Sequence, residues 1–163
     1  MPDIRSDMIQ CHVCRHSLGG GFEHLLLQRA ANEKVYPGIW QVITGSIEEG
    51  ESAVQAALRE LREETGLAAE SMYSVPYTTS FYSAHDDSVC LVPVFAAIVA
   101  HDADVRLSEE HQRFLWLPPD PAHEKLLLPS HREALRVAQH HIFSSEADAG
   151  LFSISTDLFH TQS

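Results

Sequence analysis

The stretch from residue 52 to 66, SAVQAALRELREETG, constrains the fold most strongly because it predicts an amphipathic helix with both ends marked. Ser52, with Gln55 three residues later, forms a capping-box pattern, and Gly66 stands where helices commonly end on a left-handed residue. Apolar side chains at helical spacing predict a core-facing stripe of Val54, Ala57, Leu58 and Leu61. The sequence therefore predicts a helix over 52–65 that packs against a core.

Three glutamates of this helix, Glu60, Glu63 and Glu64, lie on a face about 120° from the apolar stripe. Like charges at positions i and i+4 repel by a few tenths of a kcal/mol, so something should offset the repulsion. Carboxylates at this spacing can bind a hard cation such as Mg2+, which takes oxygen ligands and keeps waters for substrate phosphates. The alternative for any single glutamate is an ordinary solvated helix face.

The remaining chain shows further strands and a second helix. Apolar runs bounded by turn residues predict strands over 8–16, 24–30, 41–44, 71–83, 88–100 and 110–117. The segment 130–143 predicts the second helix, and PPDP at residue 118 stops the strand before it. The tail from residue 144 is compatible with a strand, a short helix or a partner-binding arm. Strands, helix, strands and helix in this order indicate an α/β fold, a mixed sheet with helices on its faces.

Length and charge limit the class of protein. With 163 residues the chain is long enough for one domain with a core and too short for two comfortable ones. Its formal net charge of -12 argues against a protein that binds a nucleic acid polymer through its phosphate backbone. We find no signal peptide and no run long enough to span a bilayer, so we expect a cytoplasmic protein without a membrane partner. Whether it forms a homodimer is left open.

Cys11 and Cys14 form a C-x-x-C pattern within the first predicted strand. One interpretation is a zinc site completed by two of the 11 histidines, but no second ligand pair follows at the spacing of known sites. The favoured interpretation is two small hydrophobic residues in a strand.

Residues 45–67, GSIEEGESAVQAALRELREETGL, match the pattern G-x5-E-x7-R-E-U-x-E-E-x-G-U, in which U is an aliphatic residue. This segment resembles the signature of the Nudix hydrolases at every fixed position. The resemblance implies an α/β/α sandwich around a mixed sheet, with one domain over 1–163, a core over about 8–143 and a tail over 144–163. It also implies hydrolysis of a nucleoside diphosphate linked to another group.

The resemblance also implies roles for individual residues. Glu63 and Glu64 are expected to bind the metal, and Glu60 either binds it or deprotonates the attacking water. Two further metal ligands are expected outside the helix, the backbone carbonyl of Thr44, just before Gly45, and the side chain of Glu110, with Glu109 as the second choice. Arg59 is expected to pair with Glu51 and hold the loop against the helix. The expected cofactor is Mg2+ or Mn2+.

The segment WQVITGSIEEGE, residues 40–51, is similar to the subgroup that cleaves dihydroneopterin triphosphate and dATP. We therefore expect a nucleoside or pterin triphosphate as substrate, cleaved to monophosphate and pyrophosphate. The residues expected to contact it are Arg29, Tyr36, Trp40 and Tyr82. Trp40 and Tyr36 could instead belong to the core. The alternatives are a hydrolase of dinucleoside polyphosphates or other nucleoside diphosphate derivatives, and a noncatalytic module that binds nucleotides.

Overall fold

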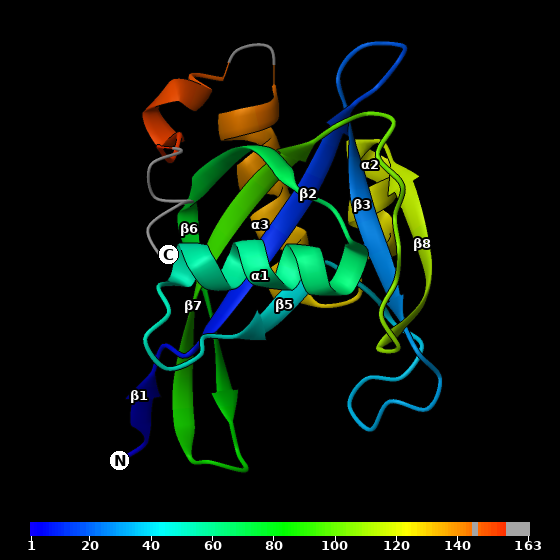
Figure 1. The fold of residues 1–163 in the computed structure, drawn as a ribbon. Helices are drawn as coiled ribbons and strands as arrows, with labels where there is room; N and C mark the ends of the chain where they lie inside the picture. The colour runs from blue at the N-terminus through cyan, green and yellow to red at the C-terminus, as the bar shows by residue number, and fades with distance from the viewer. Residues whose placement is uncertain (145–146, 156–163) are drawn as a thin grey trace.

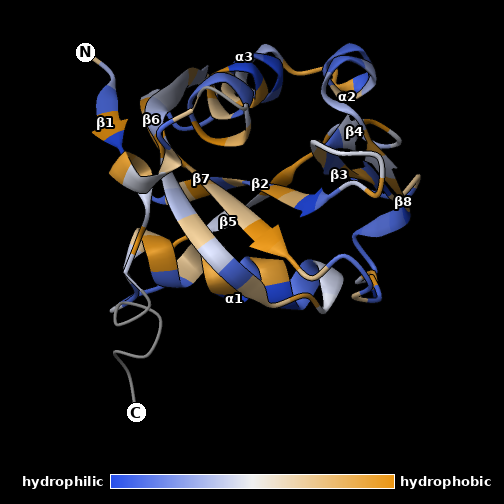
Figure 2. Ribbon diagram, turned by 90° about the horizontal axis from the view of Figure 1, so that it is seen from above, coloured by the Kyte–Doolittle hydropathy of each residue, from blue (hydrophilic) through white to orange (hydrophobic). Residues whose placement is uncertain are grey.

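The computed structural model describes residues 1–144 and 147–155 and has three layers. A mixed β-sheet forms the middle layer (Figure 1). One helix covers one face of the sheet, and two helices that follow each other in sequence cover the opposite face (Figure 2). The α/β/α sandwich expected from the sequence is therefore confirmed.

The sheet contains eight strands. They are β1 (Asp3–Arg5), β2 (Met8–His16), β3 (Phe22–Arg29), β4 (Trp40–Gln41), β5 (Ile43–Ser46), β6 (Ala69–Ser83), β7 (Ser88–Val99) and β8 (His111–Leu117). The central order is β1-β7-β2-β3-β4, with β5 paired to β2, β6 to β7 and β8 to β3. β2 runs parallel to β7 and antiparallel to β3 and β5, which makes the sheet mixed.

The helix α1 (Ala53–Thr65) forms as its sequence predicts. The Ser52 side chain accepts a hydrogen bond from the backbone N–H of Gln55, and the Gln55 side chain accepts one from the N–H of Ser52. Gly66 ends the helix with φ of 71° and donates to the carbonyl of Arg62. These local bonds satisfy groups that every helix end leaves open, so the sequence alone locates both ends.

On the sheet face opposite α1, the structure differs from the single helix expected over 130–143. α2 (Pro119–Lys125) was not expected, because three prolines in this stretch suggested only a break. Proline is tolerated in a first helical turn, where its missing N–H would have no partner, and a short helix therefore begins there. α3 (Pro129–Ala138) is followed by a π-helical segment over Gln139–Phe143.

Two strand predictions also needed correction. The strand expected over 41–44 is divided into β4, which pairs with β3, and β5, which pairs with β2. β1 was missed because its three residues are exposed, so they show no apolar pattern. In the tail, a 3-10 turn covers Ala149–Phe152 and Ser153 bridges to Tyr73, while residues 145–146 and 156–163 of the expected tail lie outside the described residues.

β2 separates two packed regions because successive side chains of a strand point to opposite faces. Ile9, Cys11 and Val13 belong to the cluster beneath α1. Cys14 belongs to the cluster beneath α3. The two thiols therefore cannot ligate one metal ion, and the zinc interpretation of the C-x-x-C pattern is wrong.

Within the described part of the chain, no helix has both the length and the apolar character needed to cross a membrane.

Candidate active site

The last two turns of α1 border a hollow of about 310 Å³, which we call the carboxylate hollow. Its lining consists of Glu60, Glu63, Glu64, Ser108, Glu109 and Glu110. The three helical glutamates thus meet both acidic residues that precede β8. The negative end of the helix dipole lies here too, which adds to the attraction for a cation.

The loop before β8 reaches α1 through the open carbonyls of the helix end. The backbone N–H of Arg106 donates to the carbonyl of Thr65 at 2.8 Å, and that of Ser108 donates to Glu64 at 3.3 Å. On the other side, the carbonyl of Glu110 accepts from the N–H of Ala30 at 2.8 Å, at the end of β3. Backbone bonds from two elements therefore place Glu110 opposite α1.

Glu64 is the most buried of the three helical glutamates, with 4% of its surface exposed. Burial, and after it the negative charges of Glu60 and Glu110, together raise the pKa of its carboxyl group to about 9. Its Oε2 atom is buried and, in the part of the chain that the structure describes, has no hydrogen-bond partner. A buried carboxylate among like charges requires a proton or a cation.

Arg59 connects the helix with the loop before it. Its guanidinium donates to the two carboxylate oxygens of Glu51 at 2.8 and 3.1 Å and to the carbonyl of Ser46 at 2.8 Å. The pKa of Glu51 is lowered because its carboxylate accepts these bonds. The ion pair expected from the sequence is present, and it holds the loop against α1.

The same guanidinium contacts Glu60 at 3.0 Å and Glu63 at 3.1 Å. The Glu60 side chain is 13% exposed and that of Glu63 is 58% exposed. Burial raises the pKa of Glu60, although Arg59 opposes this effect. Arg59 thus supplies the positive charge that these two carboxylates share.

Gly45 in β5 lies against Glu60. A Cβ atom at this position would stand 2.2 Å from the Glu60 carboxyl carbon, closer than real contacts allow. The absence of a side chain therefore lets Glu60 lie across the strand. Thr44, the preceding residue, is partly buried and pairs with Gln10 of β2. Its strand, β5, contacts α1.

The donor set fits a hard divalent cation. Carboxylate oxygens are the preferred ligands of Mg2+, and the Glu64 Oε2 atom is a buried acceptor without a partner. Within residues 1–144 and 147–155, no three acidic, histidine or cysteine side chains already stand in a metal-binding arrangement. Glu60 and Glu63 are instead turned toward Arg59.

The residues expected to contact substrate lie in three places. Arg29, at the end of β3, donates to the carbonyl of Val35 at 2.8 Å and to Glu33 at 3.0 Å, and its charge acts to lower the pKa of Glu64. Tyr36 is exposed in the same loop, with a positive φ of 47° that is uncommon for a residue with a side chain. The charge of Arg29 therefore acts on the carboxylate hollow, and Tyr36 lies in the loop that follows Arg29.

Trp40 and Tyr82 are placed differently. Trp40 is partly buried in a hydrophobic cluster with Leu117, on the face of the sheet that α2 covers. Tyr82 lies on the hairpin of β6 and β7, where its hydroxyl donates to Asp87 at 2.8 Å. Neither residue lines the carboxylate hollow.

Three residues near the site were not expected from the sequence. The hydroxyl of Ser108 lines the carboxylate hollow and, among the described residues, its buried oxygen has no partner. Gln41 and His111 are buried and in contact, with their side-chain nitrogens 2.8 Å apart. Burial lowers the pKa of His111 to about 4, with a further contribution from Arg29. No local pattern marks these residues, because each is brought to its place by the packing of segments that are distant in sequence.

The model of the NUDIX domain matches residues 16–138, and the chain therefore belongs to the Nudix family. It is a Nudix hydrolase, a class of enzyme that acts on nucleoside diphosphate-linked substrates, and members of this class generally use divalent metal ions. The motif over residues 45–67 forms the loop and helix that carry the carboxylate hollow.

One relative is the nucleoside triphosphatase NudI of Escherichia coli O81, which is 27% identical to this chain over 121 residues. The alignment covers 70% of this chain and 86% of that protein. It is 43% identical over 103 residues to an octanoyltransferase of Myxococcus xanthus, covering 62% of this chain. The aligned part is only 29% of that longer protein.

Solved structures with a similar fold include two hydrolases. An Ap4A hydrolase from Caenorhabditis elegans has a TM-score of 0.70 with 25% identity, covering 83% of this chain and 96% of that chain. The dihydroneopterin triphosphate pyrophosphohydrolase of E. coli has a TM-score of 0.64 with 25% identity, also covering 83% and 96%.

Proposed function

We propose that the protein hydrolyses a phosphoanhydride bond of a nucleoside triphosphate or a pterin triphosphate, with Mg2+ or Mn2+, and releases a monophosphate and pyrophosphate. The observation that carries this proposal is Glu64, a buried carboxyl group with an unpartnered oxygen beside Glu60 and Glu110. The names of two similar proteins, a nucleoside triphosphatase and a dihydroneopterin triphosphate pyrophosphohydrolase, support the choice of a triphosphate.

In this proposal Glu60, Glu63, Glu64, Glu110 and the carbonyl of Thr44 would hold the cation. The bound cation supplies neutralisation of phosphate charge and a water of lowered pKa. An acidic hollow cannot neutralise a polyphosphate by itself, so the carboxylates act through the cation.

The chain's own groups have distinct tasks in this proposal. Arg59 shares its charge among Glu51, Glu60 and Glu63, and it orients the carboxylates before substrate arrives. Glu60, largely covered and lying against Gly45, either holds the cation or accepts the proton of the attacking water. Arg29, at the end of β3, and Tyr36, in the loop that follows, would contact the phosphates.

The decisive experiment is a substrate screen with phosphorus NMR of the products. We expect nucleoside or pterin triphosphates to give monophosphate and pyrophosphate with Mg2+, and EDTA to abolish turnover. Reaction in 18O-water would place the label in one product and identify the attacked phosphorus. Orthophosphate plus diphosphate as products, or turnover that survives EDTA, would refute the proposal.

Variants at the hollow provide the second test. Glu63→Gln and Glu64→Gln should each reduce kcat strongly, because each removes a charge from the proposed cation site. Glu70→Gln, an exposed position on β6, is the matched control and should keep wild-type turnover. Near wild-type turnover of either variant at saturating Mg2+ would contradict the ligand assignment.

The similarity to an Ap4A hydrolase gives a second candidate, a hydrolase of dinucleoside polyphosphates. The same screen separates the two candidates. Rapid cleavage of a dinucleoside tetraphosphate together with slow cleavage of every triphosphate would favour the second. A noncatalytic module would bind nucleotides and cleave none of them.

A further inference from the structure

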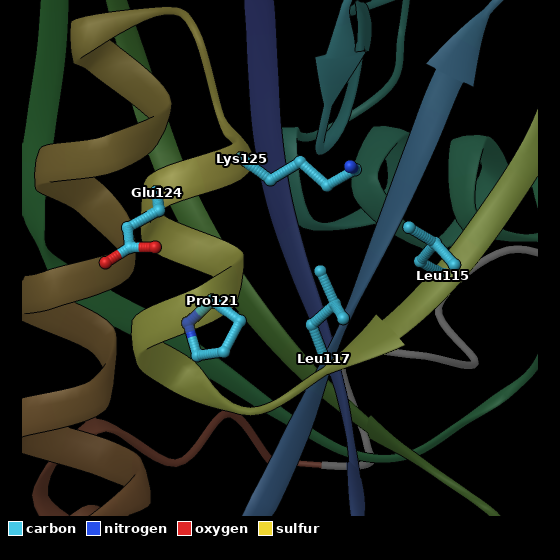
Figure 3. A pocket seen from close by; sticks show the side chains of 5 residues that line it. All are labelled: Leu115, Leu117, Pro121, Glu124 and Lys125. Atoms are coloured by element: carbon cyan, nitrogen blue, oxygen red, sulfur yellow. The ribbon is translucent and has the colours of Figure 1, made fainter.

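The greater part of β8 directs alternate side chains toward α2. Leu115 and Leu117 line a hollow of about 340 Å³ beside α2, on the sheet face opposite α1 (Figure 3). Arg113 faces the same side, because its Cζ atom lies 5.5 Å from the ring centroid of Trp40, a member of the cluster beneath α2. Since side chains of a strand alternate between the two faces, regular pairing would direct His111 toward α2 as well.

A shift in strand register turns His111 to the opposite face. Arg113 pairs with Gln28 of β3, and His111 pairs with the next residue of β3, Arg29, so two residues of β8 are passed for one of β3. A bulge of this kind re-aims the side chains beside it. His111 therefore shares the face of Arg29 and Leu27, and Leu27 belongs to the cluster beneath α1.

On this face the His111 side chain meets Gln41 of β4. Gln41 pairs with Leu27 from the other edge of β3, and its side-chain nitrogen lies 2.8 Å from Nε2 of His111. The amide nitrogen can only donate, so the imidazole Nε2 accepts and the ring carries its proton on Nδ1. Both residues are only 5% exposed. A hydrogen bond shielded from water thus spans β3 and joins β4 to the beginning of β8.

His111 also closes the turn that carries Glu109 and Glu110. Its backbone N–H donates to the carbonyl of Ser108 at 3.3 Å, with the two glutamates between them. Both glutamates line the carboxylate hollow together with Glu64, whose buried Oε2 atom has no partner among the described residues. His111 is therefore held by its side chain to β4 and by its backbone to the turn at the hollow.

We propose that Gln41 and His111 are positioning residues, which hold this turn so that the Glu110 carboxylate contributes to the cation site. This inference rests on the proposed function, in which Glu110 is a metal ligand. The bond from Ala30 to the Glu110 carbonyl ties the turn to the end of β3. The contact with Gln41 adds an anchor on β4. Groups that lie behind metal ligands orient them and thereby raise the affinity for the metal.

Mn2+ binding, measured by electron paramagnetic resonance without substrate, tests the proposal. His111→Phe removes the acceptor and Gln41→Met removes the donor, and each should weaken Mn2+ binding by at least about tenfold, the usual effect of such groups. His111→Gln keeps an acceptor near the position of Nε2 and should restore most of the affinity. In a Glu110→Gln background, His111→Phe should have no further effect, because the ligand that it positions is absent. Equal weakening with and without Glu110 would overturn the proposal.

The chain contains a matched control on the other face of the sheet. Gln10 and His12 are also buried, and their side-chain nitrogens lie 2.9 Å apart, where Gln10 donates to the carbonyl of Ser130 in α3. His12→Phe should lower the melting temperature as His111→Phe does, but it should leave the Mn2+ affinity at the wild-type value. If His12→Phe weakens Mn2+ binding as much as His111→Phe, the effect is a loss of stability and the positioning role is refuted.

Metal binding and turnover distinguish this inference from the proposed function. If the variants bind Mn2+ as expected but wild-type protein hydrolyses no triphosphate, the proposed function fails and the positioning role stands. If triphosphates are hydrolysed while His111→Phe keeps the wild-type Mn2+ affinity, the positioning role is overturned and the proposed function stands. Wild-type protein that binds no Mn2+ would overturn the positioning role as well.

Discussion

Burial distinguishes the three glutamates of α1, although all three occupy one helix face. Glu64 is almost completely buried, Glu60 is largely covered and Glu63 is mostly exposed. The electrostatic cost therefore concentrates at Glu64, whose pKa is raised to about 9.

The first prediction concerns Glu64→Gln in a metal-free buffer. The folded pKa of Glu64, about 9, exceeds its ordinary value of 4.5, so this group's contribution to stability is fully present below pH 4.5 and is lost as the pH rises through 9. The neutral amide needs no proton, and we expect the variant to have a higher melting temperature than wild type at pH 8 in EDTA. The difference should shrink toward pH 4.5. Thermal melts from pH 5 to 9 measure it, and parallel pH profiles would contradict the prediction.

The second prediction concerns Gly45→Ala. The new methyl group would collide with the carboxyl end of Glu60, a flexible side chain that can move away. We expect kcat to fall by roughly 100-fold, because displacement of a reacting group by about 1 Å has such effects, while the melting temperature changes little. Gly19→Ala is the matched control, since its Cβ would meet nothing within 4 Å. A variant with full activity would show that the position of Glu60 is not critical.

At the scale of elements, α1 begins through a reciprocal pair of bonds between Ser52 and Gln55. Ser52→Ala removes the side-chain acceptor and should reduce the free energy of unfolding by about 1 kcal/mol. Ser52→Asp keeps an acceptor and should restore most of it. Urea unfolding of the three proteins checks the prediction. Equal loss in both variants would mean that the cap contributes through something other than this hydrogen bond.

The interface of β2 and β3 with α3 holds buried histidines in their neutral form. His24 contacts the thiol of Cys14 and the side chain of Gln139, and His131 contacts the N–H of Val42. Burial lowers the pKa of His24 and of His131 to about 4. A third histidine, His12, is lowered for the same reason. This interface should therefore weaken in acid.

Acid should lower the stability of the fold, because the pKa values of these histidines are depressed. Each neutral histidine contributes stability above its ordinary pKa of 6.5, and that contribution is lost as the pH falls toward 4. For His24 the loss by pH 4 amounts to ~3 kcal/mol. We expect the free energy of unfolding of His24→Leu to fall less steeply than that of wild type between pH 6.5 and 4.5. Chemical denaturation at several pH values measures both slopes, and identical slopes would show that His24 is not responsible.

At the scale of the whole molecule, residues after α3 return to the far edge of the sheet. The N–H of Ile154 donates to the carbonyl of Met72 at 2.9 Å, and Ile154 packs against the cluster beneath α1. These contacts join the tail to β6, and none of the contacts described for it involves a residue that lines the carboxylate hollow.

Truncation after Asp148 should therefore lower the melting temperature by several degrees, since a loss of about 1 kcal/mol at the melting point has that effect in a chain of this size. The kcat/KM for the best substrate should stay at the wild-type value when measured well below the melting temperature. A truncated protein that is fully stable would show that the tail adds no net stability. A loss of turnover without a loss of stability would place the tail in catalysis.

Local sequence patterns are sufficient to predict α1, most of the strands and the spacing of the carboxylates on α1. The reason is that caps, strand alternation and the pair of Arg59 with Glu51 depend on residues close together in the chain. The same locality explains the errors. A short helix that begins on prolines and an exposed three-residue strand leave little periodic signal, so α2 and β1 were missed.

Which groups meet across the sheet depends on the packing of the whole fold. The burial of Glu64 depends on the loop before β8, and the contact of Gln41 with His111 joins strands seventy residues apart. The nearness of Lys125 to Trp40 likewise depends on where α2 packs. Such contacts arise from the packing of elements that are distant in sequence. They determine the pKa values, the pockets and the unpaired charges. Local residue spacing cannot predict these properties, because the burial of a side chain depends on everything that surrounds it.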